Sequence, residues 1–334
     1  MNHRKCLLAI VLVMITLTCA KAQDRPGSKF YLKASGGYFF SVSNGQFPNV
    51  GPYPPQDENI AINPVSGATT TLRQKVLTGS YGEGVRGGLS VGYMINKYFS
   101  VEATFCYFHS AKNLMTRAIT TIQGTNTVVG SIESHGYVNA IDFAPSIVLS
   151  PGYEKWNPYI RFGVVTPLWG RLYIETDAAK TSPVPGQPAI IVAQTTIHRK
   201  EEIKPYPTIG FQGAFGVTYT LKKQFDLFLE TEYRNIPVKS KSKEITTYDE
   251  VTKIVNSTTG QEVAPQQKRG LDDLSVAERN TDYVTTLDQN SNTPTGTTGT
   301  VTNYKDNNKP ANDLKSFINI GGLGLNLGVR FRFK

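Results

Sequence analysis

Hydrophobic and polar positions alternate with a period of two along most of the chain beyond residue 30. The final segment shows this most clearly. Its odd positions are Leu323, Leu325, Leu327, Val329, Phe331 and Phe333, and its even positions are Gly322, Gly324, Asn326, Gly328, Arg330 and Arg332. This period is that of a β-strand with one apolar face, and the other face carries glycine, amide and charge. In a membrane barrel, the apolar face meets lipid and the small or charged face lines a lumen.

The same alternation predicts eight strands in all. They cover 30–42, 84–95, 99–107, 137–149, 159–174, 208–219, 225–233 and 323–334. The phase of 159–174 is the least regular, and there we expect Leu172 and Ile174 to lie on the apolar, lipid-facing side. The alternation of 118–135 and 189–198 further suggests that strands continue as hairpins above the membrane.

The connections between these segments are short and long in strict alternation. Residues 43–83, 109–136, 175–205 and 235–316 form the long ones. Long outer loops and short periplasmic turns are typical of transmembrane barrels. The sequence therefore predicts an all-β fold, an eight-stranded antiparallel up-and-down transmembrane β-barrel with four long extracellular loops. Residues 245–255 and 283–287 could add a hairpin, which leaves a ten-stranded barrel as the alternative.

Aromatic residues gather at the two expected ends of the strands. Near the short turns lie Phe30, Tyr93, Phe99, Trp156, Tyr159, Tyr219, Phe225 and Phe331; near the long loops lie Phe40, Tyr81, Tyr107, Tyr137, Tyr173, Tyr206, Tyr233 and Phe317. Two such belts are typical of the two interfaces of a bilayer. They favour the membrane barrel over a water-soluble β-sandwich.

The first 22 residues have the three parts of a secretory signal peptide: a basic start, an apolar stretch from Leu7 to Leu17 and small residues around Ala22. We expect the mature chain to cover 23–334. Removal of this segment takes three of the 35 basic residues and no acidic one, so the net charge falls from +9 to +6. It also leaves Cys106 as the only cysteine, which excludes an intramolecular disulfide in the mature chain.

Three stretches make the chain resemble the small outer-membrane β-barrel proteins of Gram-negative bacteria, an architecture similar to the OmpA transmembrane domain and OmpX. They are the closing strand 323–334, the entry 155–159 into a strand, and 92–99 around a tight turn. The resemblance implies integral residence in the outer membrane, both termini in the periplasm, and insertion by the outer-membrane assembly machinery. It implies no single activity.

An eight-stranded barrel has an interior just wide enough for side chains, so its inward charges must share one confined lumen. The predicted lumen charge network comprises Arg86, Glu102, Asp142, Arg161, Glu230, Glu232, Arg234, Arg330 and Arg332. Charges in such a space must pair or stay hydrated. We expect a structural plug of salt bridges, with a gated or conducting path as the alternative.

Little in the sequence indicates catalysis. His109 and His135 border one loop near Ser110 and Ser134, which leaves an acyl-transfer enzyme at the outer rim as an alternative. The stretch 82–87 matches G-x-G-x-x-G but enters a strand, so it offers no helix N-terminus for a nucleotide. We therefore expect no catalytic, cofactor-binding or metal-binding residue and no cofactor.

The expected partners are outer-membrane lipid and lipopolysaccharide, the assembly machinery, and an extracellular protein or glycan bound by the loops. Basic residues near the outer rim, Lys239, Lys241 and Lys243, could meet lipopolysaccharide headgroups. Basic and acidic residues alternate, so nucleic acid is not expected. The first hypothesis is a non-enzymatic barrel that presents surface loops for interaction or envelope organisation. The alternatives are a small-solute channel or transporter and a lipid-modifying rim enzyme.

Overall fold

The computed structural model describes residues 29–42, 45–125 and 127–333, and these form an almost entirely β structure. The predicted signal peptide lies outside the described residues. The described helical segments are short, a 3-10 turn at Leu271–Asp273 and α2 at Val276–Arg279. In the described part of the chain, no helix has the length and apolarity to cross a membrane.

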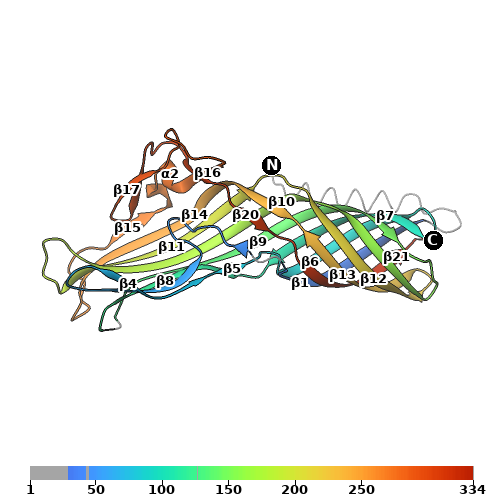
Figure 1. The fold of residues 1–334 in the computed structure, drawn as a ribbon, viewed down its shortest axis with the longest axis horizontal. Helices are drawn as coiled ribbons and strands as arrows, with labels where there is room; N and C mark the ends of the chain where they lie inside the picture. The colour runs from blue at the N-terminus through green and yellow to red at the C-terminus, as the bar shows by residue number, and fades with distance from the viewer. Residues whose placement is uncertain (1–28, 43–44, 126, 334) are drawn as a thin grey trace.

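Eight strands close into one antiparallel barrel, which fills one half of the elongated molecule (Figure 1). In order around the barrel they are β1 (Phe30–Phe40), β6 (Gly84–Met94), β7 (Phe99–Ser110), β9 (Val128–Leu149), β10 (Trp156–Pro183), β12 (Gly210–Lys222), β13 (Phe225–Asn235) and β21 (Leu323–Arg332). The last strand pairs with the first, from Tyr31↔Arg332 to Phe40↔Leu323, and closes the ring. The predicted eight-stranded barrel is confirmed.

The barrel wall follows the predicted alternation because its two faces meet different surroundings. Every second residue of β13 is buried and the residues between are exposed. The outward face is apolar, and Leu89, Phe215 and Leu327 are each more than 60% exposed. Such an apolar outer band matches lipid, and the inward band is polar and buried.

The bulge in β10 overturns one part of the predicted pattern. The register of β10 against β9 shifts between Pro167 and Trp169. An extra residue in a strand moves every later side chain to the opposite face. Leu172 and Ile174, predicted to face lipid, are therefore buried inside.

Two predicted belt aromatics also lie inside the molecule. Tyr159 and Tyr81 are 5% and 1% exposed, whereas Phe40, Trp156 and Phe317 are more than half exposed at the outer surface. Tyr159 is placed inward by the alternation of β10, in which Ile160 faces out. The prediction was wrong for Tyr159 and Tyr81 because it counted rings near strand ends without regard to the face they occupy.

Beyond the barrel, the long connections add strands to the same sheet, which continues past the barrel (Figure 1). We call this part the extension. Across it run β4 (Thr69–Val76), β3 (Gln56–Ile62), β8 (Asn113–Ile122), the outer parts of β9 and β10, β11 (Ile191–Pro205) and β14 (Pro237–Asn256). β3 pairs with β8 in parallel, and the other neighbours are antiparallel.

A small cap beside the extension completes the structure. It holds α2 together with β15 (Gln267–Gly270), β16 (Asn280–Val284), β17 (Pro294–Thr298), β18 (Val301–Tyr304) and β19 (Ala311–Leu314). β20 (Phe317–Asn319) follows the cap and pairs with the start of β14, where the barrel meets the extension. The short β2 (Gly45–Gln46) and β5 (Thr78–Gly79) pair with each other nearer the barrel. The strand predicted at 245–255 belongs to β14, which pairs with β11 outside the barrel. The ten-stranded alternative is therefore wrong.

Candidate functional site

The barrel interior holds a continuous network of buried ion pairs, which we call the plug. Its cations are Lys33, Arg86, Arg161 and Arg234, and its anions are Glu102, Asp142, Glu230 and Glu232. All eight side chains are at most 7% exposed. The equal numbers of opposite charges leave the plug formally neutral.

The contacts run as a ladder through the lumen. Lys33 Nζ lies 3.2 Å from Glu102 Oε1, and Arg161 Nε lies 3.8 Å from the same oxygen. Arg161 also donates to Glu230, at 3.1 Å from Nε and 2.5 Å from Nη2, and reaches Glu232 at 3.3 Å. A buried charge without a partner costs several kcal/mol of folding free energy, so removal of one residue of the plug destabilises the charges that it contacts.

At its other end the ladder is completed by two arginines. Arg234 donates from Nε to Glu232 at 2.7 Å and from Nη1 to Asp142 at 3.3 Å. Arg86 pairs with the same Asp142 oxygen. The Arg86 guanidinium lies 4.2 Å from the Phe108 ring centroid, where the plug meets an apolar core. That core includes Phe108, Met115, Val165, Ile174, Ile236 and Ile320.

Neutral side chains from the wall add hydrogen bonds to the network. The Tyr31 hydroxyl donates to Glu102 at 3.1 Å, and the Tyr159 hydroxyl donates to Glu230 at 3.0 Å. Asn326 donates to Glu232 at 2.7 Å. The cavity among these side chains measures about 10 Å³, at the lower limit of the ~10–15 Å³ that one water molecule needs.

Two glycines make room for the tyrosines of the plug. A Cβ on Gly92 would lie 2.0 Å from the Tyr31 ring, and a Cβ on Gly216 would lie 2.5 Å from the Tyr159 ring. Each tyrosine thus lies across the bare backbone of a neighbouring strand, as in the aromatic rescue of strand glycines. The inward glycines predicted by the alternation therefore have a packing role.

The structure brings seven of the nine residues predicted to share the lumen into the plug and places the other two at the short-turn end of the lumen. Arg330 and Arg332 lie at the short-turn end, where each lies 2.7 Å from an oxygen of Asp226. A vestibule of about 230 Å³ opens there, above the plug residues Lys33 and Glu102. The prediction missed Lys33, Asp226 and Asn326. Alternation places all three inward, so the strand phase alone could have identified them.

The histidines at the rim form no nucleophile–base pair. His109 Nδ1 lies 2.6 Å from Asn139 Oδ1, and the nearest acid to His135 is Glu133 at 3.7 Å. The Ser110 hydroxyl accepts from the backbone amide of Val138, and Ser134 pairs with Thr176. Within the described ranges, no cluster of three or more His, Cys, Asp or Glu could hold a metal ion.

One ion pair fixes the edge of the extension to its centre. Asp57 on β3 accepts two hydrogen bonds from Arg117 on β8, at 2.9 and 2.7 Å, and lies 3.4 Å from Arg73 on β4. The hydrogen bonds from Arg117 hold the pKa of the Asp57 carboxyl below its usual value of 3.8. All eight residues of β4 are exposed, and the only strand paired with β4 among the described residues is β3.

Comparisons with known proteins find matches among solved structures. No family model matches the chain, and no curated protein matches it. Among solved structures, the crystal structure of the outer membrane protein OprG from Pseudomonas aeruginosa aligns at 12% identity over 93% of this chain and 99% of that chain, with a TM-score of 0.36. The chain's own closed ring of eight antiparallel strands, with its apolar outer face, gives it the architecture of a small outer-membrane β-barrel.

Proposed function

We propose that this protein is a non-conducting, non-enzymatic barrel that anchors the extension at the cell surface, where the extension binds an extracellular partner. The observation that carries this proposal is the contrast between the two halves of the molecule. The lumen is filled by a neutral network of buried ion pairs, and the strands continue as an ordered sheet far beyond the barrel.

The lengths of the strands support an anchoring role. β10 has 28 residues, which at about 3.3 Å per residue span about 90 Å. A transmembrane strand needs only about 9–11 residues. More than half of β10 is thus available outside the membrane, and a sheet continuous with the barrel is held more rigidly than a separate loop.

The polar surface and free edge of the extension suit a partner that binds from water. β4 exposes the eight residues from Thr69 to Val76, and its outer edge offers backbone groups for pairing with another strand. The lumen, by contrast, offers a passing solute a cavity of about 10 Å³. This contrast favours surface binding over solute passage.

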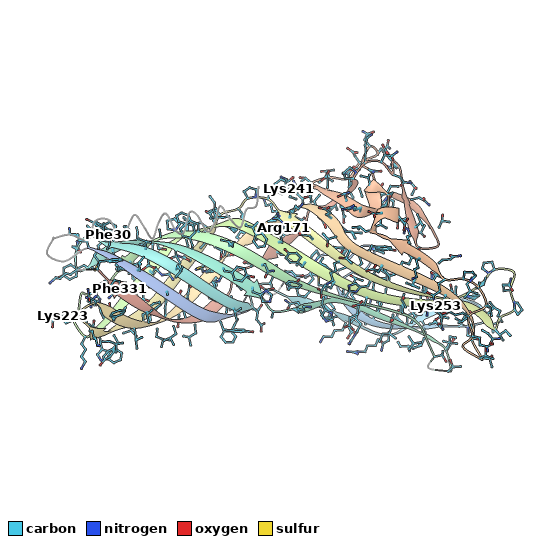
Figure 2. The ribbon with its side chains drawn as sticks, turned by 180° about the vertical axis from the view of Figure 1, so that it is seen from behind. Phe30, Arg171, Lys223, Lys241, Lys253 and Phe331 are labelled. Atoms are coloured by element: carbon cyan, nitrogen blue, oxygen red, sulfur yellow. The ribbon has the colours of Figure 1, made fainter. Side chains whose placement is uncertain are left out.

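The orientation is part of the proposal, with the extension outside the cell and the short turns in the periplasm. A membrane-impermeant, amine-reactive reagent on intact cells is expected to label Lys75, Lys253 and Lys309 on the extension and cap. Lys97 and Lys223, at the short turns, should react only after the outer membrane is opened. Figure 2 shows Lys223 and Lys253 toward opposite ends of the molecule. Labelling of Lys97 or Lys223 from outside would contradict the orientation.

Binding is tested with a shortened extension. Asp177 on β10 is paired with His198 on β11, so residues 178–197 can be replaced by an Asn-Gly turn. Nanodiscs carrying the wild type are expected to bind at least one member of arrays of extracellular proteins and glycans. The trimmed variant and empty nanodiscs should not bind it, while the heat-dependent gel shift shows an intact barrel. Equal binding by the trimmed variant would contradict the proposal.

A further inference from the structure

The barrel wall contains a side cavity of about 280 Å³ where the barrel meets the extension. We call it the side pocket. β10 pairs with β12 as far as Val165↔Gly210, and with β11 from Leu172↔Ile203 onward. Between these pairings, residues 166–171 of β10 have no strand partner on that edge within the described chain. The connection 206–209 faces them across the gap.

Three prolines keep this gap from closing as a hydrogen-bonded sheet. Pro167 lies in the β10 bulge, and Pro205 and Pro207 lie on the facing segment. A proline has no backbone N–H and cannot donate to a strand ladder. The missing N–H groups on both sides of the gap therefore prevent a regular strand pairing there.

The inner wall of the side pocket is largely apolar. It is formed by Val138, Leu172, Ile203, Val238, Ile318 and Ile320. Most of these residues belong to the buried apolar core above the plug. Arg86 of the plug reaches the carbonyl of Ile320 at 3.5 Å, so the floor of the pocket rests on the ion-pair network. The buried apolar core and Arg86 thus lie between the pocket and the rest of the plug.

The mouth of the side pocket opens at the level of the outer aromatic belt. Leu168 lines it and is 59% exposed, and Ile209 beside it is 62% exposed, both on the lipid-facing surface. Tyr206 and Trp169 complete the rim. A hydrocarbon chain can thus enter from the apolar layer without crossing water, because the apolar outer face leads directly into the apolar pocket.

Two cations line the pocket, and they differ in their partners. Arg171 is occupied by Glu202 at 2.5 Å and by the carbonyl of Gly170 at 2.7 Å. Lys239 has no carboxylate within 4 Å among the described residues, and its ammonium lies 5.6 Å from the Phe317 ring centroid. Figure 2 shows Arg171 and Lys241 near the junction of barrel and extension, remote from Phe30 at the short-turn end. Lys239 is therefore the cation free to meet an anion.

We propose that the side pocket binds one long-chain carboxylate, with its hydrocarbon chain against the apolar wall and its carboxylate on Lys239. A mostly apolar cavity with a few polar groups is the usual form of a small-molecule site, and the volume lies near the lower end of the range for such sites. Lys239 lies on the exposed face of β14, where its ammonium can meet a headgroup at the mouth of the pocket. The occupant is a single-chain amphiphile because the cavity is too small for a second chain. This binding is independent of the partner on the extension.

The test is titration with cis-parinaric acid, a fluorescent long-chain carboxylate, into protein held in nanodiscs of a neutral lipid. The wild type is expected to bind one equivalent saturably above empty nanodiscs. Val238→Phe fills the pocket and should weaken binding at least tenfold. Val329→Phe makes the same change on the lipid-facing side of β21 and should leave binding unchanged. If Val238→Phe does not fold, Ile318→Phe narrows the same cavity from β20.

A second pair of variants tests whether Lys239 binds the carboxylate of the ligand. Lys239→Gln should weaken binding of the acid severalfold and leave binding of the matching long-chain alcohol unchanged, whereas Lys241→Gln should alter neither. Equal binding by Val238→Phe and Val329→Phe, or no saturable binding above empty nanodiscs, would overturn the pocket as a site. Unchanged binding of the acid by Lys239→Gln would overturn Lys239 as its partner.

Discussion

Arg161 on β10 and Glu230 on β13 form a two-pronged ion pair across the barrel interior, although β12 lies between their strands in the wall. Arg161 Nε lies 3.1 Å from Oε2 of Glu230, and both side chains are nearly inaccessible to solvent. The pair therefore lies inside the lumen and ties non-adjacent strands together. It links the glutamates of β13 to Glu102 and Lys33 on the opposite side of the plug.

Removal of Arg161 is expected to destabilise the barrel strongly. Arg161→Ala leaves Glu230 without its arginine and weakens the neutralisation of Glu232 and Glu102. Breaking a buried pair on one side costs about 3–5 kcal/mol. The matched control is Lys112→Ala, which removes a more exposed pair with Glu175 that contributes at most about 1 kcal/mol. Urea unfolding in lipid vesicles measures both; equal losses would contradict the structural role of the plug.

Gly216 should not tolerate a side chain, because Tyr159 lies across it. Gly216→Ala places a Cβ against the Tyr159 ring and displaces the hydroxyl that donates to Glu230. Overpacking of this kind costs about 1–3 kcal/mol. Gly213→Ala, on the same strand, meets no atom within 4 Å and is the control. The same unfolding assay should separate the two variants, and a neutral Gly216→Ala would contradict the proposed packing.

The edge of the extension should loosen in acid. The folded-state pKa of Asp57 lies below its usual value of 3.8 because Arg117 donates two hydrogen bonds to the carboxylate. A depressed pKa gives stability that is fully present above the unfolded-state value and is lost as the pH falls through the lower, folded-state value. The protection of β3 and β4 against hydrogen exchange, after correction for the intrinsic pH dependence of amide exchange, is therefore expected to be high at neutral pH and to fall below about pH 4.

Asp57→Asn provides the control for this pH dependence. It removes the titrating group, so the protection of β3 and β4 should already be lower at neutral pH and should lose most of its further fall in acid. Exchange in β13, inside the barrel, should stay unchanged in both proteins. Acid-sensitive exchange of the edge strands that persists fully in Asp57→Asn would assign the effect to another group.

The barrel could be predicted from the sequence because a membrane strand has two contrasting environments. Lipid outside and a confined lumen inside require apolar and polar side chains to alternate with a period of two, as in 225–233 and 323–333. The short turns also show which strands are neighbours. The prediction failed at Leu172 and Ile174 because the bulge in β10 inserts a residue and reverses the faces that follow it. Pro167 was the available sign, since proline in strands often marks such irregularities.

The candidate site could be predicted only in part. The alternation shows which charged residues face inward. Which of them form ion pairs depends on the register between strands, and the alternation does not define that register. Lys33 and Asp226 both face inward. Lys33 forms an ion pair with Glu102, whereas Asp226 forms ion pairs with Arg330 and Arg332 at the short-turn end. The side pocket depends on the ends of β11 and β12, which lie in a predicted loop and its border.

Single-channel recording in planar bilayers tests most directly the claim that the barrel is closed. The refolded wild-type protein is expected to give no conductance steps at neutral pH, because the lumen is filled from Lys33 to Arg86 by paired side chains around a cavity of about 10 Å³. Inserted protein is verified by its heat-dependent gel shift. Reproducible conductance steps from the wild type would contradict the account, since they would require the ion pairs to part and admit a continuous column of water.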